Sequence, residues 1–189
     1  RLKTLPREDF VPEGYERLAF ADTAIPLGHG ESMMTPTIEG RLLQALGLRG
    51  DERVLEVGTG SGFMTACLAT LAAHVTSVDI HEDFVDSAAA KLDSAGIDNV
   101  ELLHLDATAE LPEGRFDAIA VTGSIQTFDP RLVDALEDGG RLFVVVGESP
   151  AMEAKLIERK SEHDWQTVSL FETDLKPLVH GAGIVEFSF

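Results

Sequence analysis

The residues from 54 to 63, Val-Leu-Glu-Val-Gly-Thr-Gly-Ser-Gly-Phe, constrain the fold of this chain more than any other stretch. Their apolar start predicts a short strand, and the apolar run at 63–71 predicts a helix. Gly58, Gly60 and Gly62 let the backbone bend sharply and let a ligand approach the main chain. The first N–H groups of the helix would point at that ligand. A strand, a glycine-rich turn and a helix in this order predict a nucleotide-type site, with a ligand-free turn as the alternative.

The spacing of these glycines distinguishes between nucleotide ligands. The dinucleotide fingerprint G-x-G-x-x-G needs its last glycine for close helix packing, and Phe63 stands in that place. Instead, Glu56 begins a Glu-x-Gly-x-Gly-x-Gly pattern that resembles the first motif of class I S-adenosylmethionine (SAM) methyltransferases. In that family the next strand ends in an acid for the ribose hydroxyls, and the stretch 74–79 ends in Asp79. The sequence therefore predicts SAM as the ligand.

From residue 51 onward, strand patterns alternate with helical patterns. We expect strands near 53–57, 74–79, 99–104, 116–121 and 140–147. We expect helices near 62–73, 83–95 and 129–137. Such alternation implies a parallel sheet with helices on both faces. The polar–apolar alternation of 152–160 and 166–171 predicts antiparallel edge strands, and 183–189 is a further strand candidate. The expected fold class is α/β, a Rossmann-like, doubly wound, mostly parallel sheet with antiparallel edge strands at the C-terminus.

The chain shows no internal repeat, low-complexity segment or linker, so we expect a single domain. Its parts would be an N-terminal loop and helix that cover the site (1–50), a SAM-binding core (51–150) and C-terminal edge strands (151–189). Within the first part, prolines and glycines predict loops up to residue 36. A helix follows, and Gly47 ends it. The chain begins at Arg1 instead of Met, so we expect native residues to precede it.

The composition argues against several partners. The net charge is −18, from 33 acidic and 15 basic residues, which repels nucleic acid phosphates and anionic membranes. A basic cluster of Lys155, Arg159 and Lys160 is expected on an exposed strand face. No apolar run reaches the roughly 18–20 residues that span a bilayer, and no signal peptide pattern is present. We therefore expect a cytoplasmic monomer that binds neither nucleic acid nor membranes.

No metal site is expected from the residue spacing. The histidines lack the spacing of metal ligands, and the single cysteine cannot form a thiolate site. Cys67 lies among Ala and Leu in a predicted helix, so burial is the expected role for it.

Two further strand ends carry candidate site residues. Asp106 follows the third predicted strand, at the sheet edge where ligands bind in such folds. An ordinary loop aspartate is the alternative. Thr122 lies at the end of the fourth predicted strand, on the same edge, near the expected position of the methyl acceptor.

Several blocks of sequence resemble the protein-L-isoaspartate O-methyltransferases. They are Leu-Pro-Arg-Glu-Asp-Phe-Val-Pro at 5–12, Ile-Pro-Leu-Gly-His-Gly at 25–30, Phe-Asp-Ala-Ile at 116–119 and Gly-Gly-Arg-Leu at 139–142. The resemblance implies methyl transfer from SAM to the α-carboxylate of isoaspartyl residues in damaged proteins, with S-adenosyl-L-homocysteine as product. A carboxylate with a pKa of about 4 is already ionised at neutral pH. Positioning and exclusion of water would then supply most of the rate, without a catalytic base.

The resemblance also assigns cofactor-binding residues. In the glycine-rich turn they are Glu56, Gly58, Thr59, Gly60, Ser61 and Gly62. At the following strand ends they are Asp79 and Ile80 for the ribose, Asp106 and Ala107 for the adenine, and Thr122.

The acceptor half of the sequence departs from the family. Met34 occupies the place of the family's active-site serine and cannot donate a hydrogen bond, while Glu31 replaces an amide with a negative charge. Ser32 and Thr35 are the hydroxyls that could compensate, so Ser32, Met34 and Thr35 are the catalytic candidates. The loop at 123–126 also differs from the family's Ala-Ala-x-Pro type. Two alternatives stay open: a diverged enzyme that methylates another acceptor such as a small molecule, and a SAM-binding protein without catalysis.

Overall fold

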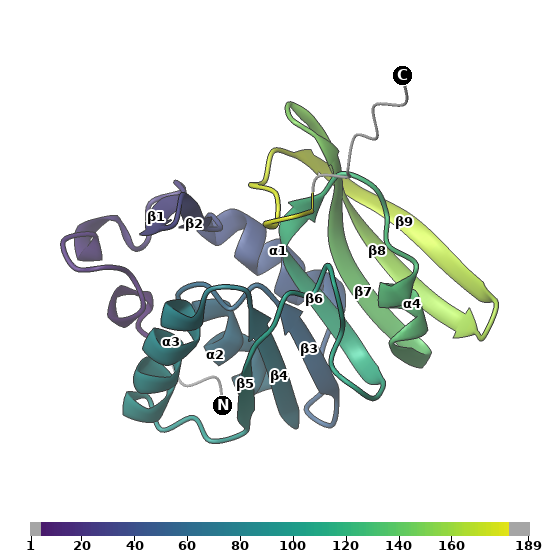
Figure 1. Cartoon of the computed structure of the whole chain (residues 1–189), viewed down its shortest axis with the longest axis horizontal. Helices are drawn as coiled ribbons and strands as arrows, with labels where there is room; N and C mark the ends of the chain where they lie inside the picture. Colours follow the sequence, from purple (N-terminus) through teal and green to yellow (C-terminus); the bar gives the residue numbers. More distant parts are fainter. Residues whose placement is uncertain (1–4, 182–189) are drawn as a thin grey trace.

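The computed structural model describes residues 5–181, and a seven-stranded sheet forms its centre (Figure 1). Its strands are β3 (Arg53–Val57), β4 (His74–Asp79), β5 (Val100–His104), β6 (Phe116–Ile125), β7 (Leu136–Glu148), β8 (Ala151–Ser161) and β9 (Asp164–Thr173). Across the sheet the order is β5-β4-β3-β6-β7-β8-β9. The first five are parallel, and β8 and β9 are antiparallel at one edge. The predicted fold class is confirmed, while the strand candidate at 183–189 lies outside the described residues.

The order of the strands creates a topological switch point. From β3 the chain proceeds outward through β4 to β5, then returns to the other side of β3 with β6. In the register, Val57 pairs with Val78 on one side and with Val121 on the other. Ligands of open parallel sheets bind outside the carboxyl ends of the strands at such a point. The glycine-rich turn after β3 lies at this position.

Helices cover the two faces of the sheet unequally. The elements α1 (Pro36–Leu46), α2 (Phe63–Leu71) and α3 (Glu82–Ser94) contribute apolar side chains to one side, together with Phe10, which directly follows the single-turn helix η1 (Arg7–Asp9). The other face is covered by the short α4 (Arg131–Asp134) and by loops. As predicted, Gly47 ends α1 in a left-handed conformation, with φ of 53°. In the part of the chain that the structure describes, no helix has the length and apolarity needed to cross a membrane.

The prediction of loops up to residue 36 is wrong for one hairpin. Strands β1 (Ile25–Gly28) and β2 (Glu31–Met33) pair antiparallel, and another single-turn helix, η2 (Glu16–Leu18), precedes them. Ile25 and Met33 are both buried, so the hairpin has its own small apolar core. The two strands are short, and the turn between them needs a left-handed backbone at His29, with φ of 52°. Because the strands are short and contain or adjoin prolines and glycines, their sequence cannot be distinguished from that of a loop.

Two predictions near β7 are wrong for a shared reason. The helix expected at 129–137 is limited to α4, and Arg159 is buried instead of exposed. The Arg159 guanidinium donates hydrogen bonds of 3.0–3.1 Å to the carbonyl oxygens of Val133, Asp134 and Leu136. These carbonyls would otherwise need helical partners, so the buried arginine allows α4 to end early and β7 to begin.

Candidate functional site

An open cleft with about 680 Å³ of empty space lies at the carboxyl ends of β3, β4, β5 and β6. The cleft is lined by eight residues that the sequence analysis selected: Ser32, Gly58, Gly60, Asp79, Ile80, Asp106, Ala107 and Thr122. These residues come from four strand ends and from the hairpin, so the fold brings them together as expected.

A second pocket of about 320 Å³ adjoins the cleft and shares five of its lining residues, Ser32 among them. It adds three selected residues, Met34, Thr59 and Ser61. Three others, Thr35, Glu56 and Gly62, line neither cavity. Thr35 instead caps α1, where its hydroxyl accepts a hydrogen bond from the Ile38 N–H at 3.4 Å.

The glycines of the turn are required by close contacts. A Cβ at Gly58 would lie 2.2 Å from the Thr122 hydroxyl oxygen, and the Gly58 φ is +98°. Thr122 itself donates to the main chain, with its hydroxyl 2.6 Å from the Gly58 carbonyl. A Cβ at Gly62 would lie 2.9 Å from the Ala88 Cβ in α3. Gly62 therefore permits the close helix packing that the sequence analysis associated with position 63.

Asp79 holds the turn from the end of β4. One carboxylate oxygen accepts from the Gly60 N–H at 2.8 Å, and the other accepts from the His81 N–H at 2.9 Å. A carboxylate has about four lone-pair positions, so acceptor capacity is left over for ligand hydroxyls. The side chain is thus placed both to shape the turn and to face the cleft.

Asp106 also lies at the cleft, with several partners of its own. The Thr108 main chain and hydroxyl donate to one oxygen at 2.9 and 2.6 Å, and His180 Nδ1 lies 2.8 Å from the other. Burial raises the pKa of Asp106, but the hydrogen bonds from Thr108 and His180 outweigh it, so the pKa lies below its usual value. An ionised acceptor is therefore present here. An adenine amino group would have to share it with His180, a residue that the sequence analysis did not select.

Glu56 supports the turn from inside the protein. It is fully buried, and one oxygen accepts from the hydroxyls of Ser77 at 2.6 Å and Thr65 at 2.5 Å. The Ser77 hydroxyl is in turn 2.6 Å from the Thr59 hydroxyl. Burial raises the pKa of Glu56 from 4.5 to about 8, although Ser77 and Thr65 oppose this shift. Glu56 therefore connects β3, β4 and α2 beneath the turn without facing the ligand.

This buried carboxyl predicts a specific pH dependence of stability. Between its unfolded pKa of 4.5 and its folded pKa of about 8, the native state keeps a proton that the unfolded state releases. The contribution of Glu56 to the free energy of unfolding is then full below pH 4.5 and falls as pH rises, by at most ~1.4 kcal/mol per pH unit. Glu56→Gln should remove this slope, so that the variant gains stability relative to wild type from pH 5 to 8 in urea denaturation. The exposed Glu101→Gln is the control, and parallel pH curves for wild type and Glu56→Gln would contradict the assignment.

The last described segment, residues 174–181, closes the other side of the cleft. Its main chain bonds to Ser124, which donates its N–H to the Lys176 carbonyl and accepts from the Leu178 N–H, both at 2.9 Å. The buried Ser124 hydroxyl donates to the Leu175 carbonyl at 2.7 Å. A Cβ at Gly123 would lie 2.6 Å from Leu178 Cδ2. The stretch 123–126 was expected to be a loop, but β6 extends through it to Ile125 and provides the small and polar groups that dock this segment.

A buried ion pair positions the acceptor side of the site, and the sequence analysis did not select it. Arg7 Nε lies 3.0 Å from the Glu39 carboxylate, and both side chains are almost fully buried. The same guanidinium donates to the Met34 carbonyl at 2.9 Å and to the Ala19 carbonyl. Burial raises the pKa of Glu39, and Arg7 opposes that shift. Arg7 thus joins η1, α1 and the segment after β2 at the second pocket.

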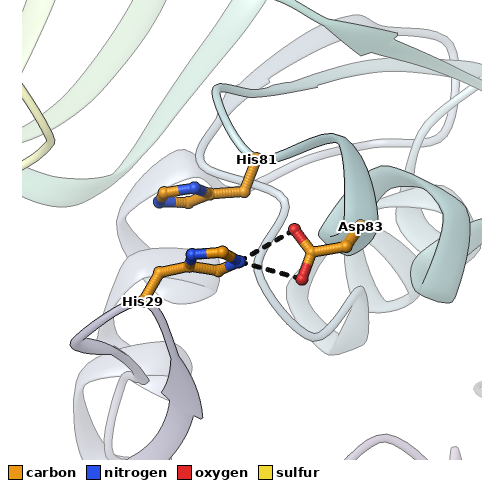
Figure 2. A group of neighbouring side chains, drawn as sticks. All are labelled: His29, His81 and Asp83. Carbon is orange, nitrogen blue, oxygen red and sulfur yellow. Dashed lines mark hydrogen bonds and ion pairs between the residues drawn. The ribbon is translucent and has the colours of Figure 1, made fainter.

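Two histidines and an aspartate, His29, His81 and Asp83, lie together, and His81 also lines the cleft (Figure 2). His29 Nε2 lies 2.9 and 3.0 Å from the two Asp83 oxygens, and the His29 and His81 rings stack 4.2 Å apart. The rings are within 8° of parallel. A ring nitrogen binds a metal in the plane of its ring, so this stacked arrangement does not direct both rings to one ion. The cluster connects the hairpin turn to the start of α3, a contact that spacing along the chain could not reveal.

Comparison with known proteins gives consistent matches. The family model described as Protein-L-isoaspartate(D-aspartate) O-methyltransferase (PCMT) matches residues 1–182. A protein-L-isoaspartate O-methyltransferase of Opitutus terrae is 40% identical over 162 residues, which cover 85% of this chain and 70% of that protein. One of Methanoculleus marisnigri is 37% identical, over 94% of this chain and 81% of its own length. Among solved structures, a Plasmodium falciparum protein described as such an enzyme, in complex with S-adenosyl-L-homocysteine, has a TM-score of 0.75. Its sequence is 24% identical to this chain, over 92% of this chain and 85% of that one. At this level of identity, the similarity concerns the fold alone.

Proposed function

The chain belongs to the protein-L-isoaspartate(D-aspartate) O-methyltransferase family, and we propose that it methylates the free carboxylate of isoaspartyl residues in peptides and proteins. It is a SAM-dependent methyltransferase, with S-adenosyl-L-homocysteine as product. The observation that carries the proposal is the pair of joined cavities at the switch point. One has carboxylates for a nucleoside, Asp79 and Asp106. The other has two residues of the acceptor side, Ser32 in β2 and Met34 directly after this strand.

The residues around these cavities fit SAM. Gly58 and Gly60 leave the main chain accessible where a Cβ would fill the turn. Asp79, Ile80 and Asp106 all line the cleft, so Asp79 would accept from the ribose hydroxyls with Ile80 beside it, and Asp106 would accept from the adenine. SAM supplies a methyl group on a positively charged sulfur.

The acceptor side of the chain binds and orients the substrate. The Ser32 side chain lines both cavities and makes no hydrogen bond with another described residue, so its hydroxyl is available to a substrate carboxylate. The buried Met34 side chain forms an apolar wall that excludes water. Thr35 acts indirectly, because its hydroxyl caps α1. No proton has to be removed from an ionised carboxylate, so the chemistry needs no base.

The proposal is tested by methyl transfer from labelled SAM to a synthetic isoaspartyl peptide, with the aspartyl peptide of the same sequence as control. We expect transfer to the isoaspartyl peptide alone. SAM binding is measured by calorimetry in the same preparation. If SAM binds and neither peptide is methylated, the proposed acceptor is wrong.

A second acceptor class is favoured by one observation. Met33 and Met34 are both buried at the second pocket, and Glu31 adds a negative charge to the cleft. Methionine side chains adapt to apolar ligands of varied shape. An enzyme with an apolar small-molecule acceptor would form S-adenosyl-L-homocysteine with that acceptor and not with the peptide. A SAM-binding protein without catalysis would form none with any acceptor.

Asp79→Ala should weaken SAM binding by about 1–3 kcal/mol, the usual loss for hydrogen bonds to a charged group. The variant loses its ligand contacts and also the bonds that hold the Gly60 and His81 amides. Calorimetric titration with SAM measures the effect. Asp86→Ala, an exposed change in α3, is the control. An unchanged dissociation constant in Asp79→Ala would refute the ribose assignment.

A further inference from the structure

The cleft is strongly acidic for an enzyme whose acceptor is an anion. Glu31, Asp79 and Asp106 all line it, and the chain as a whole carries a net charge of −18. Met34 has no hydrogen-bond donor to offer to a carboxylate. Among the described residues that line either cavity, Lys176 is the only lysine or arginine. A carboxylate that enters the cleft therefore meets one permanent positive charge from the protein.

The segment that carries Lys176 runs along the cleft and gives this charge a defined place. At the far end of the segment, His180 contacts Asp106, which lies at the proposed nucleoside end of the cleft. At the near end the Lys176 ammonium donates to the Gly30 carbonyl, in the turn between β1 and β2. Ser32 lies two residues after Gly30 in the same hairpin. Lys176 is thus at the acceptor end, while its own main chain is held through Ser124.

The chemistry of the ammonium fits a carboxylate bound beside Ser32. A lysine has three N–H donors, so one bond to Gly30 leaves two for a substrate. Hydrogen bonds between an ammonium and a carboxylate are short and strong. We propose that Lys176 is the residue that recognises the acceptor carboxylate, together with the Ser32 hydroxyl, in place of the donor that Met34 cannot supply. The inference rests on the proposed function, because it assumes an anionic acceptor.

The expected effect is on substrate binding. The substrate carboxylate keeps most of its charge when it is bound, so its ion pair with Lys176 stabilises the bound substrate as well as the transition state. Removal of the Lys176 charge should therefore raise KM more than it lowers kcat. Lys176→Met should raise the KM for an isoaspartyl peptide about 10–100-fold, the factor that corresponds to the usual worth of hydrogen bonds to charged groups. SAM affinity should stay unchanged. Binding of the peptide to the protein saturated with S-adenosyl-L-homocysteine, measured by fluorescence anisotropy, should weaken by the same factor.

Three further variants test whether Lys176 acts through its charge or through its hydrogen bond to the Gly30 carbonyl. Lys176→Gln keeps a donor for the Gly30 carbonyl and removes the charge, so it should resemble Lys176→Met. Lys176→Arg keeps the charge and should restore most of the affinity. Lys160→Met removes an exposed lysine of β8, which pairs with Glu158 away from the cleft, and should have no effect.

The outcomes distinguish the two proposals. If wild type methylates the peptide and Lys176→Met leaves both KM and peptide affinity unchanged, the role of Lys176 is wrong and the proposed function stands. If Lys176→Gln behaves like wild type while Lys176→Met does not, Lys176 only holds the hairpin, and the inference is also overturned. If wild type neither binds nor methylates the peptide, the proposed function fails, and the inference fails with it.

Discussion

Arg7→Met is expected to lower the free energy of unfolding by about 3–5 kcal/mol, the usual result of removing one partner from a buried ion pair. Both side chains of the Arg7–Glu39 pair are almost fully buried, so the substitution leaves the Glu39 carboxylate without its partner. The carbonyls of Met34 and Ala19 lose a donor as well. Urea denaturation at neutral pH measures the change.

The controls for this prediction come from the same region. Arg17→Met removes an exposed arginine of η2 and should change stability by less than about 0.5 kcal/mol. The double variant Arg7→Met/Glu39→Gln removes the buried charge and should regain part of the loss. A single Arg7→Met variant as stable as Arg17→Met would show that the pair contributes nothing. Because Arg7 also holds the Met34 main chain, peptide methylation should fall even at temperatures where the variant is folded.

Gly58→Ala should abolish most SAM binding. Two costs of about 1–3 kcal/mol each combine, one from a left-handed backbone at a residue with a Cβ and one from overpacking. The added Cβ would lie 2.2 Å from the Thr122 hydroxyl oxygen, so either the turn or β6 must move. Because both line the cleft, the movement should raise the dissociation constant for SAM more than about 30-fold, the factor that corresponds to ~2 kcal/mol. Calorimetry with SAM and S-adenosyl-L-homocysteine tests this.

A second glycine, Gly114, provides a control that distinguishes the steric contact with Thr122 from the strain of a left-handed backbone. Gly114 has φ of +102°, but a Cβ there would have no neighbour closer than 3.7 Å. Gly114→Ala should therefore cost some stability and leave SAM affinity intact. Equal SAM affinity in Gly58→Ala and Gly114→Ala would mean that the close approach to Thr122 does not matter for the cofactor.

Local sequence patterns were sufficient to predict which residues line the cofactor half of the site. Gly58 and Gly60, and the acids Asp79 and Asp106 at the following strand ends, line one cleft as predicted. In a parallel sheet the carboxyl ends of neighbouring strands meet at one edge, so positions along the chain translate directly into positions in space. Glu56 shows a limit of this translation. Its place in the motif was recognised, but its side chain points into the protein and supports the turn from beneath.

Two polar side chains have roles other than the expected ones. Thr35 was selected as catalytic for its hydroxyl, and that hydroxyl is used to cap α1. Arg159 was expected on the surface, and its buried guanidinium ends α4. The Ile38 N–H that Thr35 caps is only three residues away, so this use of the hydroxyl is a local one. The carbonyl partners of Arg159 lie 23 to 26 residues away along the chain and could not be read from nearby residues. The roles of the selected site residues, and the single-domain organisation, stay predictions until they are measured.

The sequence by itself determined the order of strands and helices from residue 51 onward, the glycine-rich turn and the acids that follow it. These features depend on backbone conformation and on hydrophobic periodicity, which are properties of neighbouring residues. Only the tertiary structure decided that Arg7 pairs with Glu39, that His29 stacks on His81 and that Lys176 reaches the hairpin turn. The partners in these contacts are separated by 32 residues or more along the chain. The Arg7–Glu39 pair forms because packing removes both side chains from water, and no local pattern records which two surfaces will meet.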